Sequence, residues 1–352
     1  AGVAAADVTF GGYGRFGVLY QGSKDAVAAG ATNASDQAAL FAAEREFARA
    51  NADTTTTPAQ LKAAQDDVAA KTLAANRSAG SNAVDDATDI TSRFRLQITA
   101  TAESDMGVTF GGMVRLEGEE RDAAKGSRAQ FNGVRYFARS GGLEVAVGNI
   151  YGALEFMPGQ YPIDLGLTGH SYEYSAFNSR ADAYQSGSLG SDGSNGVEVI
   201  YKLGDLSFHM SASDLNDRVA AHVAYNYNGF TFAAAVQDSD MEGSATEVAD
   251  TEFALSVGGT VGPADVALTW ARNGDDTGAG TLNGDHYVLA ASFDVGAATQ
   301  IDAYVADADY FANTSYGVGV HHDLGGGVSL RGGVSSTSAD QTLVDLGVRF
   351  NF

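Results

Sequence analysis

The six histidines are the side chains best suited to proton transfer or metal binding, and they are scattered along the chain. No HExxH metal motif and no GxSxG nucleophile motif occurs in the sequence. The neighbours His321 and His322 cannot act as a pair if they lie in a strand, because consecutive strand residues point to opposite faces. The glycines 325–327 lie at a predicted turn with no helix after them to hold a phosphate. With no cysteine in the chain, disulfides and Cys-ligated metals are excluded as well, so the sequence indicates a protein that is not an enzyme.

A more regular chemical pattern is formed by arginines that alternate with apolar residues. Four of them are Arg15, Arg93, Arg95 and Arg115. They lie in segments such as 8–20, VTFGGYGRFGVLY, where apolar and polar residues take turns, which is typical of a strand with two different faces. The four arginines share the polar faces of neighbouring predicted strands. Because a guanidinium group stays charged in proteins, such a face needs carboxylates or water beside it.

The same alternation continues to the end of the chain, and its interruptions are alternately short and long. The short breaks, such as 227–229, carry the Gly, Asn and Asp of tight turns. The longer connections are 118–126, 151–195, 213–217, 238–248, 272–285, 307–314 and 335–341. We therefore expect one all-β domain over residues 1–352, an antiparallel transmembrane barrel of about sixteen strands. Short turns and both termini would lie at one rim and long loops at the other, as in outer-membrane barrels.

A soluble β-sandwich is the main alternative, because its strands alternate too. Its polar face would point to water, yet here the polar face carries charged or imidazole groups in many successive strands, with almost no lysine. Aromatic residues also gather at strand ends, for example on both sides of the predicted turn at Asn228 and Gly229. Such rings suit the two interfacial girdles of a barrel in lipid. The pattern therefore favours the membrane barrel.

One segment, residues 26–87, departs from the alternation. It is rich in Ala, Asp, Glu, Gln and Lys, and it predicts two helices, one capped by Ser35 and one that begins at Pro58. The apolar stripe is modest, so the helices could pack on each other or on the barrel mouth. A lid, a surface epitope or an intersubunit contact is one interpretation of this insertion in the first long loop. A tolerated loop insertion is the other.

Three passages carry a resemblance to a known family. They are GRFGVLY (14–20), SRFRLQITATAESDMGVTFGG (92–112) and YGVGVHHDLGGGVSLRGGVSSTSADQTLVDLGVRFNF (316–352). They resemble the trimeric general diffusion porins of Gram-negative outer membranes, particularly the purple-bacterial type. The resemblance covers the chain outside 26–87. It implies sixteen strands, a homotrimer, passive diffusion of small polar solutes and a third loop folded into the barrel. The alternating C-terminal strand that ends in Phe350 and Phe352 resembles the signal that the outer-membrane assembly machinery reads.

The resemblance also indicates where solutes would meet the protein. The connection 150–195 matches the inward-folded constriction loop in position and length, and its acids include Glu155, Asp164 and Glu173. On the opposite wall we expect Arg15, Arg93, Arg95 and Arg115, and also Arg135 if the register of the fourth strand allows it. Opposed rows of charge would impose a transverse field that favours small hydrophilic solutes. The alternative is that each arginine pairs with an acid of a neighbouring strand and serves the structure alone.

The charge balance bears on partners and ions. With 21 basic and 44 acidic side chains the formal net charge is −23, which argues against nucleic acid as a partner. Acidic loops and rims predict a weak preference for cations and a possible Ca²⁺ site among loop carboxylates, although solvated acids are the simpler interpretation. We expect no required cofactor. Lipid, lipopolysaccharide and copies of the chain itself are the expected partners in the outer membrane.

Two other functions remain open from the sequence. A substrate-specific channel, for sugars for example, would line its pore with an aromatic slide, and the constriction loop offers six rings: Tyr151, Phe156, Tyr161, Tyr172, Tyr174 and Phe177. The same rings could instead pin the loop to the wall. A plugged surface barrel whose helical insertion binds a partner is the second alternative, and an open conductance would distinguish it from a channel.

Overall fold

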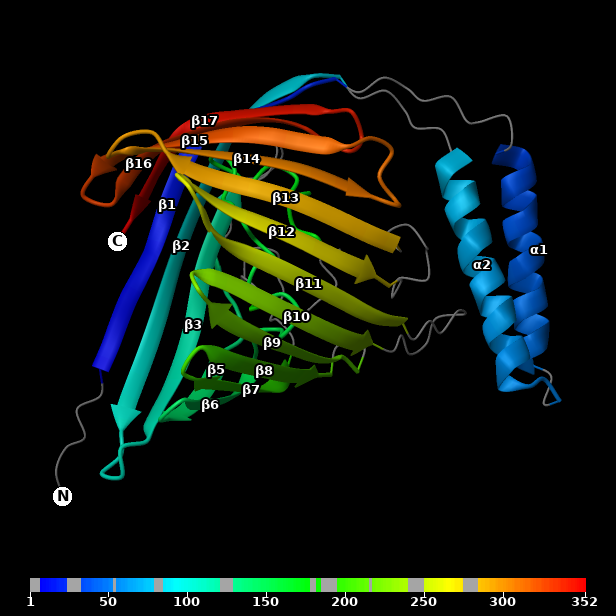
Figure 1. Cartoon of the computed structure of the whole chain (residues 1–352), viewed down its shortest axis with the longest axis horizontal. Helices are drawn as coiled ribbons and strands as arrows, with labels where there is room; N and C mark the ends of the chain where they lie inside the picture. Colours follow the sequence, from blue (N-terminus) through cyan, green and yellow to red (C-terminus); the bar gives the residue numbers. More distant parts are fainter. Residues whose placement is uncertain are drawn as a thin grey trace.

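The computed structural model describes residues 7–23, 33–52, 55–78, 85–120, 129–177, 182–184, 195–214, 217–239, 250–274 and 284–352. One closed antiparallel sheet forms the body of the molecule (Figure 1). Its strands are β1 (Asp7–Gln21), β2 (Ala87–Glu103), β3 (Thr109–Glu120), β4 (Gln130–Phe131), β5 (Arg135–Ser140), β6 (Leu143–Asn149), β7 (Asn195–Leu203), β8 (Leu206–Ser213), β9 (Val219–Tyr227), β10 (Phe230–Ser239), β11 (Asp250–Val261), β12 (Ala264–Asn273), β13 (Gly284–Asp294), β14 (Thr299–Ala308), β15 (Ser315–Gly325), β16 (Val328–Ser336) and β17 (Thr342–Asn351).

The sheet closes because β1 pairs with both β2 and β17. The short β4 and the longer β5 both pair with β3, so together they occupy one place in the barrel. The barrel therefore has sixteen strand positions, which confirms the prediction. The uncertain register of the fourth strand corresponds to the break between β4 and β5, at residues 132–134.

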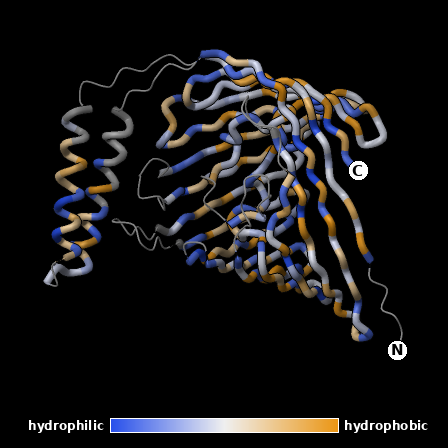
Figure 2. Tube along the Cα trace, turned by 180° about the vertical axis from the view of Figure 1, so that it is seen from behind, coloured by the Kyte–Doolittle hydropathy of each residue, from blue (hydrophilic) through white to orange (hydrophobic). Residues whose placement is uncertain are grey.

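Apolar and polar residues occupy alternate positions along the strands, and the strand register places the two sets on opposite faces of the wall. Phe16 lies between Val348 of β17 and Ser92 of β2, and its ring is 55% exposed on the outside. Its neighbour Arg15 points inward and is buried. Along most strands apolar and polar residues succeed one another in this way (Figure 2). An apolar outer surface of this kind is stable only against lipid, since water would leave it unburied.

The last residue, Phe352, is built into the wall at the rim of short turns. The amide of Gly12 donates to the carbonyl of Phe352 (2.9 Å), and the Phe352 amide donates to Gly12 (3.1 Å). The Phe352 ring stacks on Phe94 of β2, with centroids 5.5 Å apart. The last strand therefore closes the barrel through backbone and ring contacts, while the assembly-signal role of Phe350 and Phe352 stays a prediction.

The predicted helical hairpin is present as α1 (Asn33–Ala52) and α2 (Pro58–Ser78), drawn to one side of the barrel in Figure 1. A reciprocal capping box starts α2, because Thr57 N donates to Gln60 Oε1 (2.9 Å) and Gln60 N donates to Thr57 Oγ1 (3.3 Å). Phe47 and Val68 are buried between the two helices. Among the described residues the helices pack on each other and on no strand, so the alternative of packing on the barrel mouth is not seen. Neither helix is long and apolar enough to cross a membrane.

Removal of the helical hairpin should leave the barrel intact. The strands on either side are already joined at the long-loop rim, where Gln21 pairs with Ala87. Joining Ser23 directly to Asp85 would leave a short polar connection of the kind that links antiparallel strands. We expect the shortened chain to keep its β-type circular dichroism and its resistance to unfolding in detergent. Loss of the folded barrel in this variant, but not in the full chain, would contradict the prediction.

Candidate functional site

The described parts of the third long connection, residues 150–177 and 182–184, fold into the barrel as predicted (Figure 1). Its apolar side chains, among them Leu165 and Tyr174, are buried against the inner wall. The wall at this place consists mainly of alanines that face inward from successive strands: Ala220, Ala224, Ala233, Ala235, Ala254, Ala271, Ala290 and Ala306. Small side chains make room for a folded segment inside the barrel. The run of alanines at inward-facing strand positions is a sequence signal for this contact.

A buried carboxylate holds the tip of the constriction loop. Asp345 of β17 accepts hydrogen bonds from the amides of Leu167 (3.0 Å) and Thr168 (2.7 Å) and from the Thr168 hydroxyl (2.7 Å). The imidazole of His170 lies 3.3 Å from the same carboxylate. At Gly166, whose φ is +61°, an added Cβ would lie 2.4 Å from Asp345 Oδ1, so only glycine allows this close approach. Asp345 was not among the predicted site residues.

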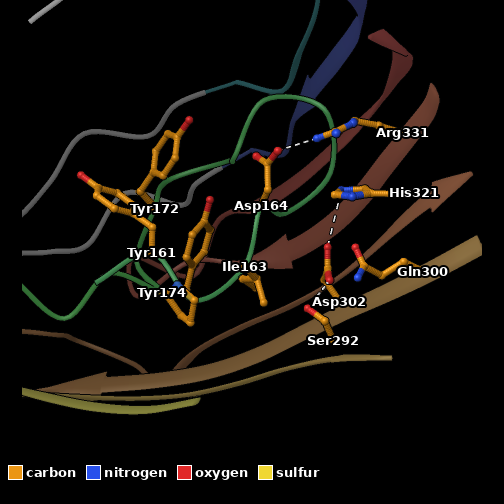
Figure 3. A pocket seen from close by; sticks show the side chains of 11 residues that line it. Tyr161, Ile163, Asp164, Tyr172, Tyr174, Ser292, Gln300, Asp302, His321 and Arg331 are labelled. Atoms are coloured by element: carbon orange, nitrogen blue, oxygen red, sulfur yellow. Dashed lines mark hydrogen bonds and ion pairs between the residues drawn. The ribbon is translucent and has the colours of Figure 1, made fainter. Parts of the chain in front are cut away.

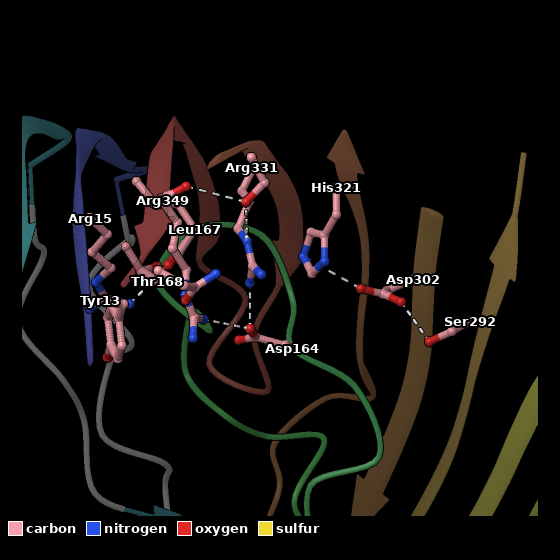
Figure 4. Close-up of polar contacts among 12 residues, drawn as sticks. Tyr13, Arg15, Asp164, Leu167, Thr168, Ser292, Asp302, His321, Arg331 and Arg349 are labelled. Carbon is pink, nitrogen blue, oxygen red and sulfur yellow. Dashed lines mark hydrogen bonds and ion pairs between the residues drawn. The ribbon is translucent and has the colours of Figure 1, made fainter. Parts of the chain in front are cut away.

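Leu167 fills a slot in the wall next to this carboxylate. Two glycines paired across the β1–β17 contact, Gly17 and Gly347, form the slot. A Cβ built on either glycine would come within 2.6 Å of a Leu167 methyl carbon. The Leu167 carbonyl also accepts a hydrogen bond from Arg15 Nη1 (2.8 Å; Figure 4). The loop tip is therefore fixed by packing, by a buried charge and by one wall arginine.

The wall arginines of β1 and β2 are matched by carboxylates of β3. Arg93 is ion-paired with Glu119, and Arg95 is ion-paired with Glu117. Arg15 also reaches Glu119, at 3.3 Å. Both carboxylates are nearly inaccessible to solvent, and charged side chains this well buried need such partners. These contacts favour the interpretation in which arginines pair with acids of neighbouring strands.

Arg135 is matched in the same way further along the wall. Its guanidinium donates to Glu198 and Glu144, both at 2.6 Å, and lies 4.1 Å from the ring centre of Tyr151. Arg115 differs, because its main contacts are with the constriction loop. It donates to the Tyr184 carbonyl (3.2 Å) and stacks on the Tyr184 ring at 4.7 Å. All five predicted arginines thus face the lumen.

Two of the three predicted loop acids, Asp164 and Glu173, have other partners than the predicted arginines. Asp164 contacts Arg331 (2.5 Å) and Arg349 (3.0 Å), two wall arginines that the prediction did not include (Figure 4). The two carboxylate oxygens of Glu173 accept hydrogen bonds from the amide and the hydroxyl of Ser338. Partners of this kind depend on how the loop packs, which a strand pattern does not reveal.

Glu155 is the one predicted loop acid in a position to oppose the predicted arginines. Its Oε1 accepts a hydrogen bond from the Tyr161 hydroxyl at 3.0 Å. The pKa of Glu155 is raised to about 7, mainly by burial and also by the nearby Asp182, while the Tyr161 hydrogen bond and the positive charge of Arg115 limit the shift. The carboxyl group is therefore partly protonated at neutral pH.

The six loop aromatics divide into two sets. Tyr174 and Phe177 are buried in the contact with the alanine wall, and Tyr151 is half-buried under Arg135. Phe156, Tyr161 and Tyr172 are exposed. The buried rings therefore pin the loop to the wall, which is one of the two interpretations given from the sequence. The surfaces of the other rings remain open to solvent. In the described part of the chain no group of three or more His, Cys, Asp or Glu side chains is arranged to hold a metal ion.

Substitution of Asp345 by alanine should release the loop tip. The Leu167 and Thr168 amides would lose their acceptor, at a cost of about 3 kcal/mol to the docked loop. We expect faster cleavage of the folded protein by an added protease and a noisier single-channel current. Asp307→Ala is the matched control, because Asp307 is exposed on the outside of β14. Equal cleavage and noise in the two variants would disprove the role of Asp345.

Comparisons with known proteins agree with this architecture. A family model described as Gram-negative porin matches residues 1–342. A porin from Fuscovulum blasticum is 31% identical over 293 residues, which cover 75% of this chain and 92% of the relative. Two solved structures of mutants of Rh. blastica porin, 23% and 24% identical, each match with a TM-score of 0.69 over 98% of this chain and 100% of theirs. The chain therefore belongs to the Gram-negative porins, a family of outer-membrane channels for passive diffusion rather than of enzymes.

Proposed function

We propose that this porin is an open, weakly cation-selective channel for ions and small hydrophilic solutes. The observation that carries the proposal is that carboxylates balance the positive charges of the arginines on the inner wall of the barrel, which we call the arginine wall. Arg15, Arg93, Arg95 and Arg135 each contact a carboxylate, so the guanidinium groups contribute little net positive charge to the lumen. The long-range potential then follows the acidic balance of the whole chain, −23. Screening over about 8 Å at physiological salt keeps the preference weak.

The constriction has its own local field. Glu155 on the loop is close enough to Arg115 on the wall for the two charges to interact. Arg95 is partly exposed and stands beside the same stretch of wall, on β2 next to β3. A dipolar solute that passes between them is oriented by the field, and an apolar solute would have to displace ordered water.

We further propose a homotrimer in the outer membrane, with lipopolysaccharide around it. Membership of the porin family supports the trimer. Gly12 and Gly112 on the outer parity would permit close subunit contact. Divalent cations such as Ca²⁺, bound between surface carboxylates and lipid phosphates, complete the proposal. Native mass spectrometry of the detergent-extracted protein, with and without a chelator, tests both the trimer and its dependence on cations.

Removal of wall charge should change the ion preference. In Arg95→Ser with Arg115→Ser the lumen loses two positive charges, while Glu117 still has Arg93 at 3.8 Å. We expect a wider constriction, a larger conductance and a rise of about twofold or more in the ratio of cation to anion permeability. The measurement is the reversal potential in a planar bilayer under a salt gradient.

The control for this experiment is Arg272→Ser. Arg272 lies at the long-loop rim, half-exposed and 3.2 Å from Asp285, so its loss removes a positive charge without touching the constriction. An unchanged reversal potential in the double variant would contradict the proposed selectivity mechanism. Absence of any conductance in the unaltered protein would refute the open channel itself.

Cation preference should rise with pH around neutrality. Because the pKa of Glu155 is raised to about 7, its carboxyl is mainly neutral near pH 6 and mainly charged near pH 8. The reversal potential should therefore move toward the cation equilibrium potential as pH increases over this range. Glu155→Gln should remove most of this dependence. A pH profile that is identical in the variant and the unaltered protein would show that another group titrates.

A further inference from the structure

Two cavities of the described structure differ in their chemistry. The cavity between the constriction loop and strands β13–β16 is lined by charged groups, among them Asp164, Asp302 and Arg331 (Figure 3). A hollow of about 730 Å³ lies instead on the outer face of the barrel, across strands β7–β12. The outer side chains that line this hollow carry no charge. Whatever occupies the hollow is therefore held by apolar contact and not by ion pairs.

The floor of the hollow is low because small side chains lie together there. Ala221 of β9 pairs with Val236 of β10. At the next outer positions of the same two strands, Val223 pairs with Ala234. The two alanines are thus diagonal neighbours, and no side chain larger than valine stands at these four positions. Elsewhere the outer face carries many exposed leucines, phenylalanines and tyrosines, so the four positions form a depression in it.

Larger side chains stand on both sides of this floor. Phe208 and Met210 of β8 pair with the floor positions of β9, and Phe253 and Leu255 of β11 pair with those of β10. All four are exposed, Met210 by 59% and Leu255 by 51%. Because neighbouring strands lie about 4.8 Å apart, the backbones of β8 and β11 are about 14 Å apart across the floor. The hollow therefore has room for an extended hydrocarbon chain between its two side walls.

The hollow lies at the depth of lipid chains. Its floor residues are well inside β9 and β10, away from the turn at 228–229 and from the long-loop rim. The next outer residue of β10 toward that rim is Asp238, whose carboxylate accepts from the Thr251 hydroxyl at 3.0 Å. Toward the short turn the next outer pair is Tyr225 with Phe232, and such rings suit the interface. Between these borders the membrane consists of hydrocarbon, so a lipid meets the hollow with its chain and not with its head group.

The hollow is also far from the surface proposed for subunit contact. The small outer residues of that surface, Gly12 and Gly112, lie on β1 and β3. Since β4 and β5 share one place, β9 and β10 are seven and eight strand positions away from β1. In a barrel of sixteen positions this is the opposite side. A trimer that joins through β1 to β3 leaves the hollow in contact with the lipid of the outer membrane.

We propose that this hollow binds one hydrocarbon chain of a lipid of the outer membrane and holds it longer than the rest of the wall does. The inference goes beyond the channel function and rests on the place of the barrel in the membrane. A chain in the hollow contacts the floor and both side walls, whereas a chain on a level part of the wall contacts a single surface. No charged group of the protein has to be desolvated for this contact.

The chain provides its own probe for the test. Trp270 lines the hollow and is the only tryptophan in the sequence, so tryptophan fluorescence reports on this place alone. The full-length protein in a mild detergent is titrated with a phosphatidylcholine whose chains carry bromine, which quenches tryptophan on contact. We expect saturable quenching. Native mass spectrometry with the unbrominated lipid should show one retained lipid per protomer.

Three variants examine the walls and the floor. Ala221→Leu with Ala234→Leu fills the floor and should raise the half-quenching lipid concentration roughly threefold or more, with a matching loss of retained lipid. Met210→Ala lowers one side wall and should weaken binding in the same direction, so the test stands even if the filled variant does not fold. The matched control is Ala291→Leu with Ala303→Leu, two alanines that pair across β13 and β14 outside the hollow. It should bind lipid as the unaltered protein does.

Several outcomes would overturn the lipid site. Equal binding by the filled and the control variants would disprove it. Retained lipid without quenching of Trp270 would place the lipid elsewhere on the wall. Absence of quenching in vesicles made of the brominated lipid would show that another molecule, such as a second copy of the chain, covers this face. Each of these results leaves the channel function standing, and the single-channel conductance of each variant shows that it has folded.

Discussion

The buried carboxylate of Asp345 is the interaction on which the arrangement of the lumen depends. A loop inside a barrel has left the solvent, so its backbone amides need acceptors from the wall. Asp345 supplies acceptors at the loop tip, and the slot between Gly17 and Gly347 takes up the Leu167 side chain beside it. With the tip fixed, other described apolar side chains of the loop lie against the alanines of β9–β14. The open part of the lumen is the space that this docking leaves.

The arginine wall shows how a barrel can carry many like charges at close range. Neighbouring guanidinium groups repel one another, and burial would make each one costly. The acids of β3 lie between them and share their hydrogen bonds, so Glu117 and Glu119 together serve Arg15, Arg93 and Arg95. Arg115 instead stacks on a loop tyrosine. The arginines thus pair with acids of neighbouring strands and also line the pore, so the structural and the functional interpretation both apply to them.

Strand parity made much of this structure predictable. Because the side-chain period of a strand is two, the sequence alone placed Arg15, Arg93 and Arg95 on the inside and Phe16 on the outside. The sixteen strands and the helical insertion followed from turns and composition. The loop contacts did not, because Asp164 meets Arg331, and Thr168 meets Asp345, across sequence separations that no local pattern encodes. The alanine wall was readable in principle, as inward positions that lack the charge found elsewhere on the same parity.

The helical hairpin between β1 and β2 has a consequence for how this barrel can evolve. The two ends of the insertion meet at one residue pair, Gln21 with Ala87, and the helices bury their apolar side chains on each other. We therefore expect that this segment can be gained, lost or exchanged as a unit without an effect on barrel assembly. Sequence drift in the hairpin is limited only by its own small core and by whatever meets it outside the cell. The first long loop is therefore a place where segments can be exchanged, whereas the third loop is constrained by its many contacts with the wall.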